Sequence, residues 1–149
     1  MYDNFMEKSV YQMFILGSGE YLDFALNKGL GGVIFFTRDI QTKDQFKYLI
    51  GDIVKKSKIR PFLSIDQEGG RVERTENIHE RYLSPRMAFA KGEKFLEAQS
   101  IQIAKELKDY GINLNFAPCA DVNTNPENPI IGERAFSDNS KSCSSFWHP

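Results

Sequence analysis

An apolar run from Phe62 to Ile65 ends abruptly at Asp66, which opens a cluster of charges around the paired glycines Gly69 and Gly70. The run is typical of a β-strand, so Asp66 is predicted to stand at the carboxyl end of that strand, where parallel α/β folds place their ligands. A carboxylate there can accept two charge-assisted hydrogen bonds from adjacent hydroxyl groups. The alternative for Asp66 is a cap on the Gly69–Gly70 bend. The sequence favours ligand binding.

Arg74 ends the same charged run and is a second candidate for ligand contact. Its planar guanidinium can hold a hydroxyl and a carbonyl or carboxylate together. The alternative is an ion pair with Glu73 or Glu76 on a solvated loop. Arg71 is predicted to pair with a carboxylate inside the loop scaffold. Asp121 ends a later apolar run, where its carboxylate is equally suited to touching a ligand and to supporting the residues that do.

Four stretches of the chain carry a recognisable pattern in a fixed order. They are GGVIFFTRD (31–39), FLSIDQEGGRVER (62–74), GINLNFAPCADV (111–122) and PIIGERAFS (129–137). Together they resemble the family 3 glycoside hydrolases, and most closely the bacterial β-N-acetylhexosaminidases of that family. The similarity covers roughly residues 13 to 139 and corresponds to the front half of the family's catalytic domain.

The resemblance implies roles for individual residues. It assigns sugar binding to Asp66 and Arg74, and it places Arg134 on the sugar in the innermost subsite. Ala135 stands where the family usually has serine, which alters the local hydrogen bonding beside Arg134. Asp121 is retained as a candidate either for substrate contact or for support of the residues that make it. No metal ligand and no cofactor are implied.

The resemblance also implies a retaining mechanism, which needs a nucleophile on one side of the anomeric carbon and a proton donor on the other. In the family these are an aspartate late in the barrel and a histidine–aspartate pair after a Lys-His-Phe-Pro-Gly-His-Gly motif. That motif does not occur here, so no catalytic residue is expected in this chain. The chain is expected to be an inactive fragment of an enzyme that removes terminal β-linked N-acetylhexosamine from peptidoglycan fragments. The alternatives are a family 3 β-glucosidase or β-xylosidase fragment and a non-catalytic sugar-binding half-barrel.

Short apolar runs alternate with helical periodicity, as in successive βα units around a parallel sheet. Strands are predicted at 13–16, 33–36, 62–65 and 113–117, and helices at 21–27, 43–57 and 88–110. The apolar face of the second helix is predicted to carry Phe46, Ile50, Ile53 and Val54. Long connections at 68–86 and 118–138 follow strand carboxyl ends and are therefore predicted to be functional. The expected fold is α/β: a truncated (β/α)8 TIM-type barrel with about four βα units.

Composition excludes several classes of protein. Nineteen basic and twenty acidic residues give a net charge of −1, which argues against a nucleic-acid partner. No apolar stretch reaches the roughly 18 residues of a membrane span, and no signal peptide is recognised at the start. A cytoplasmic location is therefore expected. Cys119 and Cys143 are predicted to be ordinary reduced thiols, and His79 and His148 to be bystanders.

The last ten residues, 140–149, include four serines and show no helical stripe where family members continue with a helix. The sequence therefore predicts one domain at 1–139 and an aberrant tail at 140–149. A shift of reading frame near Lys141 is the preferred explanation, and an engineered boundary or a natural short form is the alternative. A half-barrel also leaves sheet edges exposed, so self-association is expected.

Overall fold

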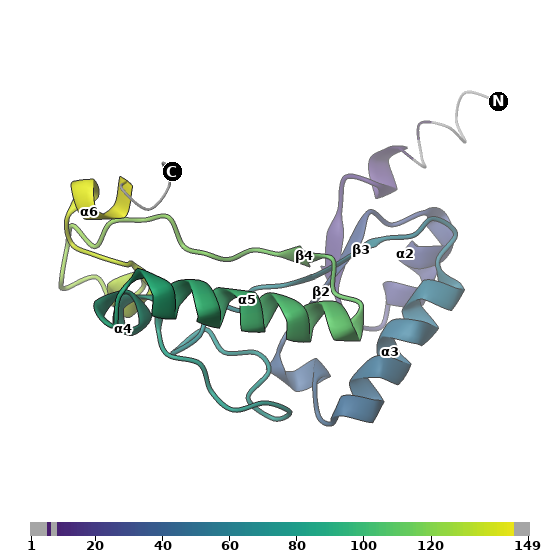
Figure 1. Cartoon of the computed structure of the whole chain (residues 1–149). Coiled ribbons are helices and arrows are strands. Elements are labelled where there is room, and N and C mark those ends of the chain that lie inside the picture. The colour runs from purple at the N-terminus through teal and green to yellow at the C-terminus, as the bar shows by residue number, and fades with distance from the viewer. Residues whose placement is uncertain (1–5, 7–8, 145–149) are drawn as a thin grey trace.

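The computed structural model describes residues 6 and 9–144 (Figure 1). Strands and helices alternate along the chain. In order, the elements are β1 (Ile15–Gly17), α2 (Leu22–Lys28), β2 (Gly32–Phe35), η1 (Thr37–Asp39), α3 (Lys43–Lys56), β3 (Phe62–Ile65), α4 (Pro85–Ala90), α5 (Glu93–Tyr110), β4 (Leu114–Asn115), η2 (Gly132–Arg134) and α6 (Ser140–Ser144).

The four strands form one parallel sheet in the order β1-β2-β3-β4. The core lies between this sheet and the helices, where Val33 and Phe35 of β2 pack with Phe46 of α3 and Leu107 of α5. The rings of Phe35 and Phe46 meet edge to face, 5.3 Å between centroids. Consecutive parallel strands with their helices outside make up half of a (β/α) barrel, so the predicted fold class is confirmed.

Helix α3 forms where its sequence pattern predicts. The Thr42 hydroxyl accepts a hydrogen bond from the Gln45 amide and caps the first turn. Phe46, Ile50 and Ile53 are buried on the inner face. The prediction that Val54 shares this face is wrong, because Val54 lies at its margin and is 36% exposed.

The segment predicted as one helix at 88–110 is divided into α4 and α5. Gly92 separates them with a positive φ of 102°, a conformation that an α-helix cannot contain. Ser84 and Pro85 move the start of the helical region forward, because the Ser84 hydroxyl caps the Met87 amide and proline suits the first helical position. Gly111 ends α5 in the left-handed conformation, as predicted. No helix of the described residues is long and apolar enough to cross a membrane.

The outer strands are shorter than, or shifted from, the predicted ranges. β1 begins at Ile15, two residues later than expected, and β4 contains only Leu114 and Asn115. Asparagine side chains supply some of the hydrogen bonds that backbone groups of a longer β4 would make to β3 and the residues after it. The Asn113 carboxamide accepts a hydrogen bond from the Leu63 amide, 2.8 Å away, because a strand with few backbone pairs leaves the β3 amide needing another acceptor.

The structure forms α6 over Ser140–Ser144, where the sequence predicted no helix. Cys143 is buried against Ala88, Leu96 and Phe136, so a packing contact sets this turn in the absence of a helical stripe. Both cysteines are free, as predicted. The end of the predicted tail, including His148, lies outside the described residues.

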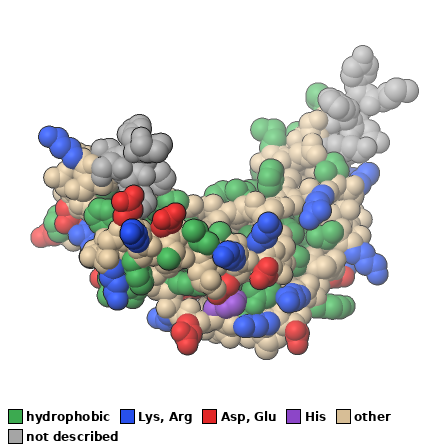
Figure 2. Space-filling view, viewed as in Figure 1, with side chains coloured by type: hydrophobic (Ala, Val, Ile, Leu, Met, Phe, Trp, Pro, Cys, Tyr) green, Lys and Arg blue, Asp and Glu red, His purple; other side chains and the backbone are tan. Residues whose placement is uncertain are grey.

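One face of the sheet carries no helix in the described part of the chain. Ile15 and Phe62 both pair in register with Gly32 on this face, and they are 38% and 57% exposed. An apolar groove of about 700 Å³ also runs between α5 and β4, next to Phe136. Hydrophobic side chains reach the surface along the concave upper edge of the molecule (Figure 2). Strands β1 and β4 each have one unpaired edge among the described residues.

We propose that copies of this chain associate through the uncovered sheet face and edges, because unpaired strands and exposed apolar surface recruit further chains. Light scattering at increasing protein concentration is expected to report species larger than a monomer. Phe62→Lys should reduce the assembled fraction. Tyr48→Lys, on the outer side of α3, is the control and should leave it unchanged. A monodisperse monomer with one sharp thermal transition would contradict the proposal.

Candidate functional site

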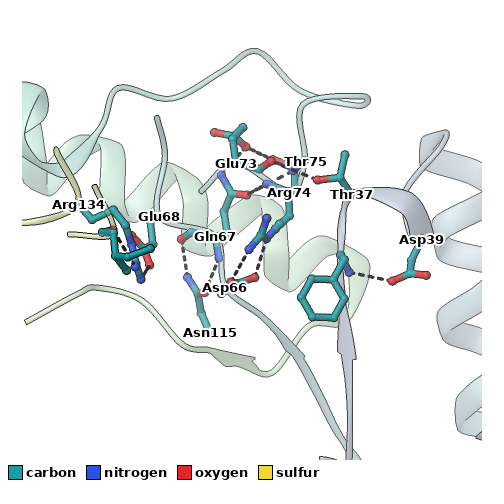
Figure 3. Close-up of polar contacts among 12 residues, drawn as sticks. Thr37, Asp39, Asp66, Gln67, Glu68, Glu73, Arg74, Thr75, Asn115 and Arg134 are labelled. Atoms are coloured by element: carbon teal, nitrogen blue, oxygen red, sulfur yellow. Dashed lines mark hydrogen bonds and ion pairs between the residues drawn. The ribbon is translucent and has the colours of Figure 1, made fainter. Parts of the chain in front are cut away.

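The carboxyl ends of β2, β3 and β4 meet at one edge of the sheet, and polar side chains gather there (Figure 3). Asp66 directly follows β3, and Asn115 ends β4. The long connection after β3 folds back over this edge and brings Arg74 to Asp66. The connection after β4 brings Arg134 to the same edge. The candidate site is therefore built from two long loops on a rigid sheet.

Asp66 and Arg74 form a two-point ion pair. Arg74 Nε donates to Asp66 Oδ1 at 2.7 Å, and Nη2 donates to Oδ2 at 2.6 Å. About a quarter of each side chain is exposed, so both can still be reached by a ligand. The hydrogen bonds that Arg74 donates to Asp66 raise the pKa of Arg74, which keeps the guanidinium charged. The alternative pairing of Arg74 with Glu73 or Glu76 does not form, and Glu76 instead pairs with Arg81.

Arg74 also lies over an aromatic ring. Its guanidinium carbon is 5.6 Å from the centre of the Phe36 ring, and that of Arg38 is 5.1 Å from it. The buried Asp39 fixes the turn that presents Phe36, since its Oδ2 accepts the Phe36 amide at 2.8 Å. Ser18, after β1, donates to the same carboxylate. The end of β2 thus provides a platform for Arg74.

The paired glycines shape the loop, as predicted. Gly69 and Gly70 have φ values of +94° and +62°, and a Cβ atom on either would lie within 2.6 Å of Leu83 or Ser84. Their amides donate to the carbonyls of Val72 and Tyr82. Asp66 therefore does not cap this bend, and its carboxylate is left for Arg74.

Arg134 forms the second two-point pair of the site. Its Nε and Nη2 donate to the two carboxylate oxygens of Glu68 at 2.9 and 2.7 Å. The Glu68 side chain is 2% exposed and that of Arg134 is 26% exposed, so the carboxylate is a buried support beneath a more accessible cation. The hydrogen bonds that Arg134 donates to Glu68 raise the pKa of Arg134. Glu68 was not singled out by the sequence; its place two residues after Asp66 was the available signal.

Two other arginines hold the connection that carries Arg134. The prediction that Arg71 pairs with a carboxylate is wrong: it donates to the carbonyls of Pro129 and Ile130, because the loop that crosses above it presents backbone acceptors. Its scaffold role is retained. Arg86 of α4 pairs with Asp138 and lowers the pKa of that carboxyl to about 2.

The structure does not bring Asp121 into contact with the two ion pairs. Asp121 is exposed, and its carboxylate accepts a hydrogen bond from Cys119 Sγ at 3.6 Å. Burial raises the pKa of the Cys119 thiol. His79 lies on the far part of the first loop and contacts α5. Its Nδ1 is 3.3 Å from Glu106 Oε2, and its Nε2 is 3.1 Å from the Tyr110 hydroxyl. Over residues 6 and 9–144, no cluster of three or more His, Cys, Asp or Glu side chains could hold a metal ion.

The fold and this site define a class of protein: half of a (β/α) barrel with carboxylates and arginines at the carboxyl ends of its strands, where barrel enzymes bind their ligands. Comparison with known proteins specifies the family. Residues 6–147 match the glycosyl hydrolase family 3 N terminal domain, so the chain belongs to glycosyl hydrolase family 3. The predicted family is confirmed.

Curated relatives and solved structures agree with this assignment. The chain is 37% identical over 120 residues to Beta-hexosaminidase A of Pseudoalteromonas piscicida, covering 74% of this chain and 20% of that protein. It is 32% identical over 126 residues to a Beta-hexosaminidase of Methylococcus capsulatus, covering 80% and 36%. The chain therefore spans about a fifth to two fifths of the length of such relatives.

Among solved structures, a family 3 beta-N-acetylglucosaminidase from a Paenibacillus species matches with a TM-score of 0.86 and 27% identity, over 95% of this chain and 29% of that one. NagZ from Neisseria gonorrhoeae, in complex with N-trifluoroacetyl-D-glucosamine, matches with a TM-score of 0.72 and 25% identity, over 89% and 43%.

The two ion pairs generate a prediction for a protein in which this chain is joined to the rest of a family 3 barrel. Asp66→Ala should lower kcat/KM more than Arg71→Lys does. Asp66 offers a charge-assisted contact worth about 1.5–3 kcal/mol, roughly tenfold to more than a hundredfold, whereas Arg71 only holds backbone carbonyls. Steady-state kinetics on both variants gives the comparison. Equal or reversed losses would mean that scaffold and site have been confused.

Proposed function

We propose that this chain carries the sugar-recognition half of a retaining β-N-acetylhexosaminidase. The main support for this proposal is the Asp66–Arg74 pair, which lies partly exposed at the carboxyl end of β3 beside the Arg134–Glu68 pair. The relatives named as beta-hexosaminidases support this function over the β-glucosidase or β-xylosidase alternative.

The lone pairs of Asp66 explain how the site would take a sugar. Each carboxylate oxygen accepts one hydrogen bond from Arg74 and keeps acceptor capacity for a hydroxyl. Two neighbouring hydroxyls of a pyranose could therefore bind the two oxygens, while unused N–H groups of Arg74 face an acceptor such as an acetamido carbonyl. Arg134, held from below by Glu68, would supply a second cation to the same sugar.

The proposed reaction is hydrolysis of a terminal β-linked N-acetylhexosamine with retention. It requires a nucleophile and a proton donor on opposite sides of the anomeric carbon. The Lys-His-Phe-Pro-Gly-His-Gly motif does not occur in the 149 residues. We propose that the nucleophile and the proton donor belong to protein outside these residues. We place the whole enzyme in the cytoplasm, acting on N-acetylglucosamine-bearing peptidoglycan fragments without metal or cofactor.

The proposed function predicts binding by the chain itself. Saturation-transfer NMR should detect N-acetylglucosamine bound to the purified chain, and glucose should bind more weakly because it lacks the acetamido group. Asp66→Asn should weaken N-acetylglucosamine binding about tenfold or more, since it removes the charge from the central acceptor. Asp109→Asn, an exposed change at the far end of α5, is the matched control. Equal binding by both variants would reject Asp66 as the sugar ligand.

A second prediction concerns turnover. The 149-residue chain should not hydrolyse an aryl β-N-acetylglucosaminide, because positioning alone does not replace a nucleophile and a proton donor. Release of the aryl chromophore is the measurement, with Asp66→Ala as the background control. Turnover by the wild-type chain above that control would show that the chain contains catalytic groups of its own.

A further inference from the structure

A buried network of hydrogen-bonded side chains adjoins the Asp66–Arg74 pair, and the sequence pattern did not reveal it. Gln67 is 1% exposed, Glu73 is 3% exposed and Thr75 is 2% exposed. The Glu73 carboxylate accepts hydrogen bonds from Gln67 Nε2, from Thr75 Oγ1 at 2.8 Å and from the Tyr82 amide at 3.2 Å. All of these donors are neutral, and no ion pair of Glu73 is present within the described residues.

The network reaches Arg74 through its backbone. Gln67 Oε1 accepts the Arg74 amide at 2.7 Å and the Thr75 amide at 3.3 Å. Asp66 holds the guanidinium of Arg74, and the next residue in the chain holds its amide (Figure 3). Two consecutive residues at the end of β3 thereby fix both ends of one arginine.

Glu73 decides which way the Gln67 carboxamide faces. A carboxylate can only accept, so it requires the NH₂ group of Gln67 on its side and leaves the carbonyl oxygen for the Arg74 amide. If the carboxamide were turned around, the NH₂ group would face the N–H groups of Arg74 and Thr75, and its oxygen would face the carboxylate. Both contacts would be repulsive inside a buried site.

From this geometry we infer that Glu73 and Gln67 are positioning residues for the sugar-binding arginine: Glu73 orients the Gln67 carboxamide, and the carboxamide places Arg74 against Asp66. Only the statement that Arg74 binds a sugar rests on the proposed function. The positioning of Arg74 is itself measurable without any ligand.

The readout is the rate at which phenylglyoxal modifies Arg74, followed by pepsin digestion and mass spectrometry. The exposed Arg60 in the same molecule serves as the internal reference. In the wild-type chain the two-point pair with Asp66 should make Arg74 react more slowly than Arg60.

Gln67→Glu keeps an acceptor for the Arg74 amide but sets a second carboxylate against Glu73. It should raise the Arg74 rate about tenfold, the effect of losing one well-placed hydrogen bond. The double variant Gln67→Glu with Glu73→Gln restores a donor facing an acceptor between the two positions. It should bring the rate back toward that of the wild type, a rescue that loss of packing alone would not produce.

Gln99→Glu is the matched control. Gln99 joins the same loop to α5 by accepting the Leu83 amide and donating to the Leu83 carbonyl, so the identical chemical change loosens the loop away from Arg74. The Arg74 rate should stay that of the wild type, and thermal melts should report the folding of every variant. A rise with Gln99→Glu equal to that with Gln67→Glu, or no rescue in a folded double variant, would overturn the inference.

Titration of the same variants with N-acetylglucosamine separates the two proposals. No binding by the wild-type chain would reject the proposed function and leave the labelling result standing. Binding by the wild-type chain together with unchanged Arg74 labelling in Gln67→Glu would reject the positioning role alone.

Discussion

The fold of the site depends on one constraint: the chain after β3 must turn back so that Arg74 reaches the carboxylate at the end of the strand it has just left. Glycines at 69 and 70 make the turn sterically feasible, and the two-point pair with Asp66 closes the loop. Everything else at this edge is arranged around the closed loop. Glu68 within it supports Arg134, and Arg71 within it holds the backbone at Pro129 and Ile130.

The two ion pairs differ in the burial of their anions. Asp66 remains partly exposed, whereas Glu68 is nearly inaccessible. A buried carboxylate loses much of its hydration, and its two hydrogen bonds to Arg134 compensate for that loss. Glu68 is therefore too buried to contact a ligand, and we propose that a ligand meets the exposed parts of Arg134 and of the Asp66–Arg74 pair. The division between support and contact follows from accessibility rather than from residue type.

The sequence predicts best where one local pattern decides the outcome. The apolar run of β3, the capped amphipathic α3 and the glycine after α5 each settle their own boundaries. Asp66 and Arg74 stand out because they open and end the charged run that directly follows β3. It fails where a contact distant in sequence decides. Nothing local shows that Glu68 meets Arg134, 66 residues later, or that Cys143 has a buried seat beside Leu96. Gly92 lies inside the helix predicted at 88–110 and divides it, because its positive φ is incompatible with an α-helix.

The pairing of Asn115 with Gln67 has a wider consequence. The Asn115 carboxamide accepts the Gln67 amide at 3.0 Å and donates to the Gln67 carbonyl at 3.1 Å, so the last residue of β4 grips the residue whose side chain seats Arg74. A short series of hydrogen bonds through Gln67 thus connects β4 to Arg74. A strand that pairs with β4 and restrains Asn115 would therefore also restrict the conformations open to the Arg74 side chain. By thermodynamic reciprocity, a ligand that immobilises Arg74 makes the edge a better template for the next strand.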